Sequence, residues 1–204
     1  MKSWIITGGI GCGKSSVCEL MTKHLLAGAP TLFSADLEVQ ALFDKPEILA
    51  ELCQAFGSEV VTHANGKDEV NRAWLREQVF SDSKKKSELE GILHPSVLKS
   101  LESERENQQK AGANLFLAEV PLHYEIGGTV SADLIIVVAA SPEVQKRRLM
   151  ERRGLDESII EQMLRAQWPI EAKVERADVV IWNDGDRSAL EAQVLTLARQ
   201  HWPA

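Results

Sequence analysis

The amino-acid sequence predicts an α/β fold, in which a parallel five-stranded sheet carries helices on both faces. Two observations support this prediction. Short apolar runs, which are typical of buried parallel strands, alternate along the chain with helical patterns. A glycine-rich motif follows the first apolar run and precedes an amphipathic segment that extends from residue 15 to about residue 26. We expect the strands at residues 4–7, 31–34, 115–120, 134–139 and 178–182.

Three of the expected helices begin with a recognisable cap. Ser141-Pro142-Glu143 combines a serine cap with a proline in the first turn. Ser158 and Ser188 each stand three residues before a glutamate, which is the spacing of a capping box. The last helix carries a stripe that should pack on the core, formed by Leu190, Val194, Leu197 and Ala198.

One long interval departs from the alternation of strands and helices. Residues 46–112 contain hardly any strand signal and read as several helices, with a turn at Asn65-Gly66 and a break at Pro95. Connections of this length are uncommon, so we expect a helical inserted subdomain within a single domain. The core would then comprise residues 1–45 and 113–204, and the basic segment at about 145–176 would form a lid.

Composition and charge narrow the class of partner. Of the 204 residues, 44% are hydrophobic and 26% are charged, which is enough for one substantial core. A net charge of −7 argues against nucleic acid as a partner, because phosphate backbones require a basic face. The longest apolar run, residues 134–140, is too short for a membrane span. The first apolar run does not fit a secretion signal, and three cysteines without metal-ligand spacing favour a reducing compartment. We therefore expect a soluble cytoplasmic protein.

The most specific motif is Gly8-Gly9-Ile10-Gly11-Cys12-Gly13-Lys14-Ser15. It fits G-x-x-x-x-G-K-[ST], the phosphate-binding loop or P-loop, in the strand–loop–helix context that the motif requires. The fold is therefore expected to be that of P-loop nucleoside-triphosphate hydrolases and nucleotide kinases. Backbone N–H groups of the loop and of Ser16 would face the phosphates of ATP. Lys14 would contact the β- and γ-phosphates, and the Ser15 hydroxyl would bind Mg²⁺. Loop amides would activate the thiol of Cys12, unless Cys12 is simply a tolerated small side chain.

Two acids follow expected strands, where parallel sheets bind their ligands. Asp36 comes after the second strand and would accept a proton from an attacking hydroxyl or orient Mg²⁺-bound water. Its alternative role is to cap the helical segment that begins at Leu37. Glu119 ends the third strand and would hold magnesium through water, or it is a solvated strand end.

Arginines gather after the fourth strand. Arg148 and Arg152 are four residues apart and project from one helix face, where they would stabilise the charge of a transferring phosphoryl group. The alternative is a solvated surface paired with nearby glutamates. Arg72 and Arg76 have the same spacing and would bind phosphates of the acceptor, with surface exposure an equal alternative. His94 would kink or cap a helix as readily as it would contact a ligand.

These landmarks together resemble the dephospho-coenzyme A kinase family over nearly the whole chain. That family has T-G-G-I-G-S-G-K-S at the loop, and the sequence from Thr7 to Ser15 differs only at Cys12. The family's D-A-D is matched by Ala35-Asp36, with Ser34 in place of the first acid. The further landmarks are Arg72-x-x-Leu75-Arg76-x-x-Val79-Phe80, Leu93-His94-Pro95, Pro121-Leu122-His123-Tyr124-Glu125 for P-L-L-F-E, Ser141 to Gln145, Arg148 with Arg152, Gln167 with Lys173, and Ala177 to Gly185.

The resemblance implies transfer of the γ-phosphoryl group of ATP to the 3′-hydroxyl of dephospho-coenzyme A, the last step of coenzyme A synthesis. It implies that Asp36 is the base, that Arg148 and Arg152 belong to the lid, and that Asn183 and Gly185 lie near the adenine. It implies that the acceptor binds to the helical insert and its surroundings, with Arg72, Arg76, His94, Leu122 and Glu125 as contacts. The departures at Ser34 and at His123-Tyr124 concern fine contacts with the acceptor more than the reaction itself.

Two other functions share the loop and the sheet. The first is that of a nucleoside or nucleotide kinase, which acceptor competition would distinguish. The second is that of a P-loop ATPase or switch module, against which the sequence contains neither N-K-x-D nor L-S-G-G-Q. We expect a small-molecule acceptor, no nucleic-acid or membrane partner, and a monomer or weak homo-oligomer.

Overall fold

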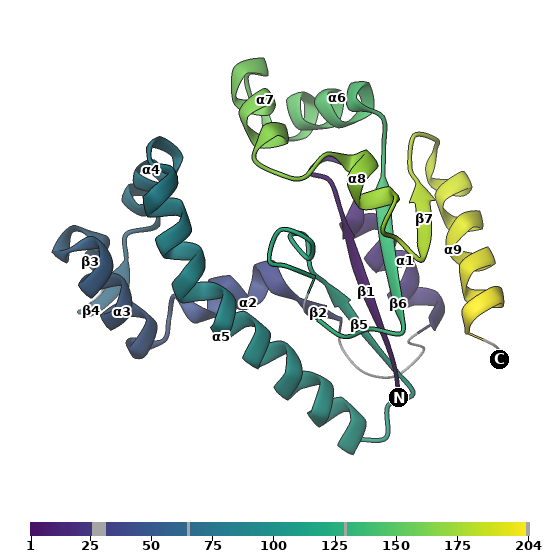
Figure 1. Ribbon diagram of the computed structural model, residues 1–204, viewed down its shortest axis with the longest axis horizontal. Coiled ribbons are helices and arrows are strands. Elements are labelled where there is room, and N and C mark those ends of the chain that lie inside the picture. Colours follow the sequence, from purple (N-terminus) through teal and green to yellow (C-terminus); the bar gives the residue numbers. More distant parts are fainter. Residues whose placement is uncertain (26–31, 65, 129, 203–204) are drawn as a thin grey trace. The chain divides into compact units, whose positions relative to one another are not determined.

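The computed structural model describes residues 1–25, 32–64, 66–128 and 130–202, without the side chains of Ala64, Ser81, Arg152 and Arg153. The chain divides into two compact units (Figure 1). Residues 1–34 and 105–204 form the first unit, and residues 35–104 form the second.

The first unit is built on a five-stranded sheet in the order β2-β5-β1-β6-β7, and every neighbouring pair is parallel (Figure 1). The parallel sheet of five strands is therefore confirmed, although residue 31 of the expected second strand lies outside the described residues. The chain runs to one side of β1 for β2 and β5 and then to the other side for β6 and β7. This reversal beside β1 is where such sheets bind ligands. The strands are β1 (Lys2–Gly8), β2 (Phe33–Ser34), β5 (Leu115–Glu119), β6 (Leu134–Ala139) and β7 (Val179–Trp182).

Helices α1 (Lys14–Leu25) and α9 (Arg187–His201) pack on each other and bury the main core against the sheet. The predicted stripe of the last helix is confirmed, because Leu190, Val194 and Leu197 are all buried in this core. Alternate residues of the strands face it, as the pleat of a strand requires. Between β6 and β7 lie α6 (Pro142–Arg153), α7 (Glu157–Arg165) and α8 (Ile170–Val174), and α8 contacts β6.

The second unit is mostly helical but contains a hairpin that the sequence analysis did not predict. Strands β3 and β4 pair antiparallel around the predicted turn at Gly66, whose φ is 75°. Each strand has four residues and the second begins with three exposed charged or polar side chains, so the segment resembles a polar loop. Its elements are α2 (Ala35–Leu42), α3 (Pro46–Phe56), a 3₁₀ turn (Ser58–Val60), β3 (Val61–Ala64), β4 (Lys67–Val70), α4 (Arg72–Ser81) and most of α5 (Ser83–Lys110).

The predicted break at Pro95 is wrong, because α5 continues through this residue. A proline inside a helix removes one hydrogen bond and costs about 3 kcal/mol. Around it, the buried side chains of Leu93, Val97 and Leu101 recur every four residues and stabilise the helix. Among the residues described, none of the helices combines the length and the apolar character needed to cross a membrane.

The cap at Ser141 is confirmed, since its hydroxyl accepts a hydrogen bond from Val144 N at 3.4 Å. The other two predicted caps are wrong. Asp156 precedes α7, and Asp186 caps α9 by accepting from Ala189 N at 2.8 Å. Aspartate is as favourable as serine at the position before a helix. Because Asp156 and Asp186 stand two residues before the predicted serines, α7 and α9 begin earlier than expected.

Candidate active site

The P-loop connects β1 to α1 at the point where the strand order reverses. Gly8 and Gly13 have φ values of 142° and 90°, which side-chain-bearing residues rarely adopt. A Cβ on Gly8 would lie 2.1 Å from the carbonyl oxygen of Val138, and one on Gly13 would lie 2.3 Å from Asn183 Nδ2. Glycine is therefore required at both positions, because the loop packs directly on β6 and on the segment after β7.

Two side chains from distant parts of the chain hold the carbonyl side of this loop. Asn183 is buried and donates from Nδ2 to Cys12 O at 2.8 Å. Arg148 of α6 donates to Gly11 O and Cys12 O, each at 3.4 Å. The N–H and C=O of a trans peptide point in opposite directions, so the N–H of Gly13 faces away from Asn183. The N–H of Gly13 thus faces the other side of the loop, where an anion would bind, whereas Cys12 N donates to Gly9 O at 3.3 Å.

Lys14 is the first residue of α1, and its ammonium group lies beside the beginning of the loop. Nζ donates to Gly8 O at 3.1 Å and to Gly9 O at 3.0 Å. Ser15 follows in the first turn of α1 and is exposed. The structure therefore brings together a backbone donor, a lysine and a hydroxyl at one helix N-terminus, and their role as a phosphate site stays a prediction.

Glu119 lies near the same helix turn. It ends β5 beside Ile6 of β1 and Ser34 of β2, and its carboxylate forms a hydrogen bond with the thiol of Cys18. Cys18 follows Ser15 by three residues, so the two share one face of α1. Burial, followed by the charge of Glu119, raises the pKa of the Cys18 thiol.

A magnesium ion fits these oxygen donors. Mg²⁺ prefers oxygen ligands and is usually held by one or two side chains together with substrate phosphates and water. Ser15 and Glu119 supply a hydroxyl and a carboxylate next to the phosphate-binding loop. Within the described residues no three His, Cys, Asp or Glu side chains form a closed metal cage.

The thiol of Cys12 is fully buried. Burial raises its pKa, although Lys14 acts in the opposite direction. The neutral thiol is therefore favoured, which supports the interpretation of Cys12 as a small side chain within the loop rather than an activated nucleophile.

Asp36 is exposed and lies two residues after the end of β2. Helix α2 begins at Ala35, so Asp36 is the second helical residue and not the residue before the helix. Its negative charge still favours the helix N-terminus. The strand that precedes it ends beside Glu119.

The other predicted acceptor contacts of the insert lie in the second unit. Arg72 donates to Gln40 O at 3.2 Å and lies over the ring of Phe43, while Arg76 is exposed. His94 is partly buried in α5, and burial lowers its pKa despite the opposing charge of Glu90. In the first unit, Gly185 is exposed after β7, and Arg152 lies in α6 with its side chain outside the described residues.

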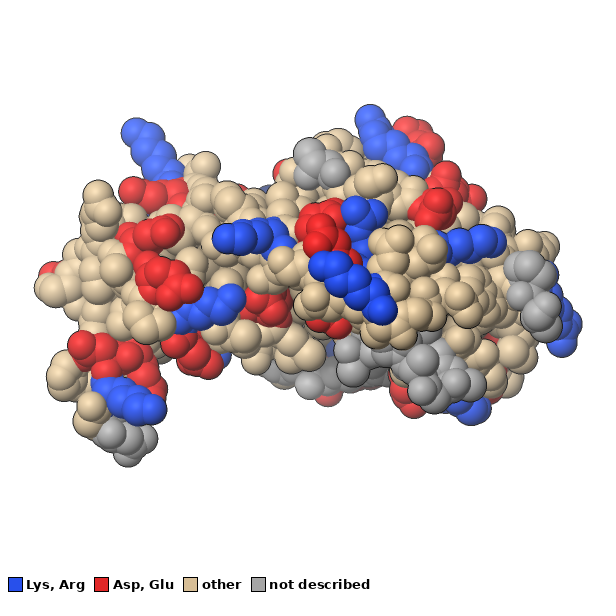
Figure 2. Space-filling view, turned by 90° about the horizontal axis from the view of Figure 1, so that it is seen from below, with Lys and Arg blue, Asp and Glu red and all other residues tan. Residues whose placement is uncertain are grey.

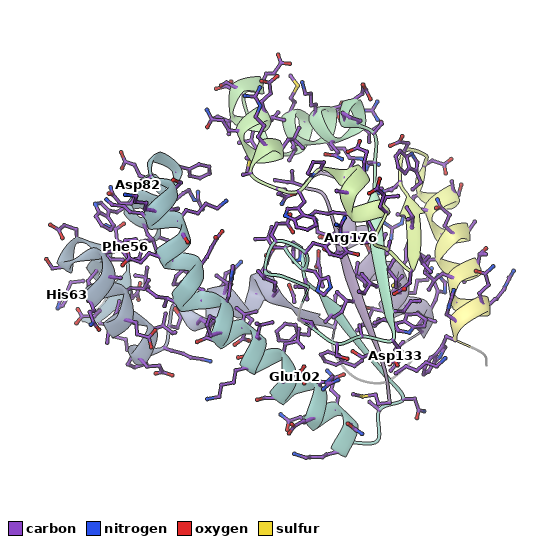
Figure 3. The ribbon with its side chains drawn as sticks, in the orientation of Figure 1. Phe56, His63, Asp82, Glu102, Asp133 and Arg176 are labelled. Atoms are coloured by element: carbon purple, nitrogen blue, oxygen red, sulfur yellow. The ribbon has the colours of Figure 1, made fainter. Side chains whose placement is uncertain are left out.

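Glu125, another predicted acceptor contact, is the centre of a buried polar cluster. It follows Leu122 in the turn after β5, and its Oε1 lies 2.7 Å from Nζ of the fully buried Lys173. The same oxygen accepts from Trp168 N at 3.0 Å. Arg176, labelled in Figure 3, follows α8 and lies 5.1 Å from the ring centre of Trp168. Glu125 therefore joins the turn after β5 to the segment between α7 and α8. Sequence reasoning noted Lys173 among the basic residues after the fourth strand and as the partner of Gln167 in the family pattern, but it did not predict the pair with Glu125.

We expect Lys173→Met to lower the free energy of unfolding by about 3–5 kcal/mol, because Glu125 is left charged and largely buried without its partner. Chemical denaturation measures this loss. Adding Glu125→Gln to the same variant removes the uncompensated charge and should recover much of the stability. A double variant that is no more stable than Lys173→Met would contradict this account of the pair.

His123 lies beside this cluster and is fully buried. Neither of its ring nitrogens, nor the hydroxyl of Tyr124, has a hydrogen-bond partner within the described part of the chain. Burial lowers the pKa of His123, Glu125 opposes this effect and Lys173 adds to it. The histidine is therefore favoured as the neutral ring, at the cost of unpaired polar atoms in the interior.

We expect His123→Leu to stabilise the protein by about 1–3 kcal/mol, because it removes the buried unpaired nitrogens. The gain should be larger in acid. The unfolded chain binds a proton near the ordinary histidine pKa of 6.5, whereas the folded chain does so only at lower pH. Stability of the unaltered protein therefore falls as pH drops through 6.5, by at most about 1.4 kcal/mol per pH unit. Urea denaturation at pH 5.5 and 7.5 measures both effects, and an equal gain at the two pH values would argue against burial of a neutral His123.

The family model described as "Dephospho-CoA kinase" matches residues 4–189. The dephospho-CoA kinase of Syntrophotalea carbinolica is 34% identical over 94% of this chain and 88% of its own length. That of Geobacillus kaustophilus is 33% identical over 98% and 96%. A solved structure, TT1252 from Thermus thermophilus, is 30% identical with a TM-score of 0.79 and covers 98% of this chain and 97% of its own. The chain belongs to the dephospho-CoA kinase family.

Proposed function

We propose that this protein transfers the γ-phosphoryl group of ATP to the 3′-hydroxyl of dephospho-coenzyme A. Membership of the family makes it a kinase, and therefore a transferase, of coenzyme A biosynthesis. The observation that supports ATP as the donor is the P-loop, in which the N–H of Gly13 faces away from Asn183 and Lys14 lies beside the loop.

The charges of the site suit phosphoryl transfer. The transferring group carries negative charge on its oxygens, and catalysis consists mainly of positioning and electrostatic stabilisation. Lys14 binds the β- and γ-phosphates in this proposal, and Arg148, already against the loop, adds a second positive charge. Ser15 and Glu119 would hold Mg²⁺, which when bound supplies further neutralisation of the phosphates.

The acceptor side of the proposal depends on Asp36, which takes the proton of the 3′-hydroxyl or orients metal-bound water. The insert at residues 46–112 would bind the rest of the acceptor, with Arg72, Arg76 and His94, while Leu122 and Glu125 would contact it from the turn after β5. Asn183 and Gly185 would lie at the adenine side of ATP. The segment at about 145–176, with Arg148 and Arg152, would form the lid that excludes water.

The surface supports a small-molecule acceptor rather than a nucleic acid. Figure 2 shows acidic and basic side chains interspersed on the face in view, and the whole chain carries a net charge of −7. A nucleic-acid partner would require a continuous basic face. The cytoplasmic location and the monomeric or weakly oligomeric state stay predictions.

One experiment tests the function directly. ADP release from ATP and Mg²⁺ is measured with and without dephospho-coenzyme A, and the product is identified by mass. We expect release that depends on the acceptor and a product heavier by one phosphoryl group. Faster turnover with nucleosides or nucleoside monophosphates would instead favour a nucleotide kinase, and hydrolysis without any acceptor would favour an ATPase.

A further inference from the structure

Gln167, which has no role in the site described above, contacts the P-loop directly. Its side-chain oxygen Oε1 accepts a hydrogen bond from Ile10 N at 2.9 Å. The two residues are 157 positions apart, and Gln167 lies in the short segment between α7 and α8. A polar side chain from this segment therefore contacts the backbone of the P-loop at Ile10.

The hydrogen bond fixes which end of the Gln167 amide faces the loop. Ile10 N–H is a donor, so the atom opposite it has to be the acceptor Oε1 and not the donor Nε2. Nε2 shares a carbon with Oε1 and lies about 2.2 Å from it by covalent geometry, so it stands beside the loop with two N–H groups. Among the described residues, no protein acceptor is bonded to them.

The position of Lys14 indicates which phosphate of a bound triphosphate would lie near this donor. The P-loop lysine contacts the β- and γ-phosphates of a bound triphosphate. Here Nζ of Lys14 lies against the carbonyls of Gly8 and Gly9, which directly precede Ile10. Ile10 and Gln167 are therefore at the end of the loop where the terminal phosphate is expected.

The backbone around Gln167 is held in place on both sides. Gln167 N donates to Leu164 O at 3.3 Å. The next residue, Trp168, donates from its backbone N–H to Glu125, which is paired with the buried Lys173, and its ring stacks on Tyr124. A side chain anchored in this way is presented to the loop at little cost in conformational entropy.

We propose that Gln167 binds the terminal phosphate of ATP through Nε2 while Oε1 keeps its hydrogen bond to Ile10. The inference rests on the proposed function only in taking ATP as the nucleotide. It makes Gln167 a phosphate-binding residue that distinguishes a triphosphate from a diphosphate, because ADP lacks the group that Nε2 contacts.

The test compares the affinities for ATP and ADP, measured by calorimetry in Mg²⁺ without acceptor. Gln167→Glu keeps an oxygen for Ile10 N–H but replaces the donor with a negative charge. We expect it to weaken ATP binding about tenfold to a hundredfold, as a lost hydrogen bond to a charged group implies, and to leave ADP binding within about threefold. Gln167→Ala should also weaken ATP binding, but less, because it introduces no negative charge that would repel the phosphate. Gln162→Glu, the same change at an exposed position of α7, is the matched control and should leave both affinities unchanged.

The alternative outcome is that Gln167 only fixes the loop. In that case Gln167→Glu would retain both affinities, or Gln167→Ala would weaken ATP and ADP equally, and either result overturns the proposal. If Gln167→Glu fails to fold, the ratio of ATP affinity to ADP affinity in Gln167→Ala provides the test. A failure of the proposed function would give a different result: the unaltered protein would bind ATP but would not phosphorylate dephospho-coenzyme A.

Discussion

Replacing Lys14 with alanine is expected to lower kcat by about a thousandfold or more while the protein remains folded. Removing a single preorganised donor from a developing negative charge typically costs 10²–10³ in rate, and here a full positive charge is lost as well. In the structure the ammonium group bonds to two loop carbonyls, at 3.1 and 3.0 Å from Gly8 O and Gly9 O. Lys14 is only partly buried and the shape of the loop is set by its glycines, so we expect the thermal unfolding midpoint to change little.

The matched control is Lys23→Ala in the same helix. Lys23 is exposed and pairs with Glu191 at 2.9 Å, far along α1 from the loop. Surface pairs of this kind contribute about 0–1 kcal/mol, so this variant should keep its activity. Steady-state assays with saturating ATP and acceptor compare the two variants. A Lys14→Ala enzyme that retains a tenth of the normal kcat would contradict the assignment of Lys14 to the transferring phosphate.

The features that sequence analysis predicted correctly depend on local patterns. Strands β1, β5 and β6 appear as short apolar runs because both of their faces are buried, whereas β7 is an apolar run although Val180 and Trp182 are exposed. The P-loop appears because its glycines satisfy a backbone geometry that few residues adopt. The role expected for Arg148, stabilising the transferring phosphoryl group, stays a prediction; in the structure its guanidinium group donates to the carbonyls of Gly11 and Cys12.

The features that were missed depend on contacts between distant residues or on competition between near-equal signals. Gln167 meets Ile10 across 157 positions, and no spacing in the sequence indicates that contact. Glu125 was expected to contact the acceptor, but its pairing with Lys173 became visible only when the chain was folded. Asp156 and Asp186, and not the predicted serines, precede α7 and α9, because aspartate and serine have similar preferences for the position before a helix.

Asp36→Asn is expected to lower kcat by about 10²–10⁴, the usual contribution of a general base, with little change in stability. Asparagine keeps the size and polarity of the side chain but accepts no proton. If Asp36 only stabilises the start of α2, Asp36→Asn should lose about 0.3–1 kcal/mol in the free energy of unfolding and keep normal turnover.

Glu47→Gln separates these two roles. Glu47 is likewise an exposed acid in the first turn of a helix, α3, so its replacement removes the same kind of helix-dipole interaction without touching the proposed chemistry. Both variants should therefore lose similar, small amounts of stability, and only Asp36→Asn should lose activity. If the carboxylate acts as the base on the acceptor hydroxyl, ATP affinity measured without acceptor should be unchanged in Asp36→Asn. Near-normal turnover would remove Asp36 as the base, whereas a loss of ATP binding in Mg²⁺ would show that it acts through the metal instead.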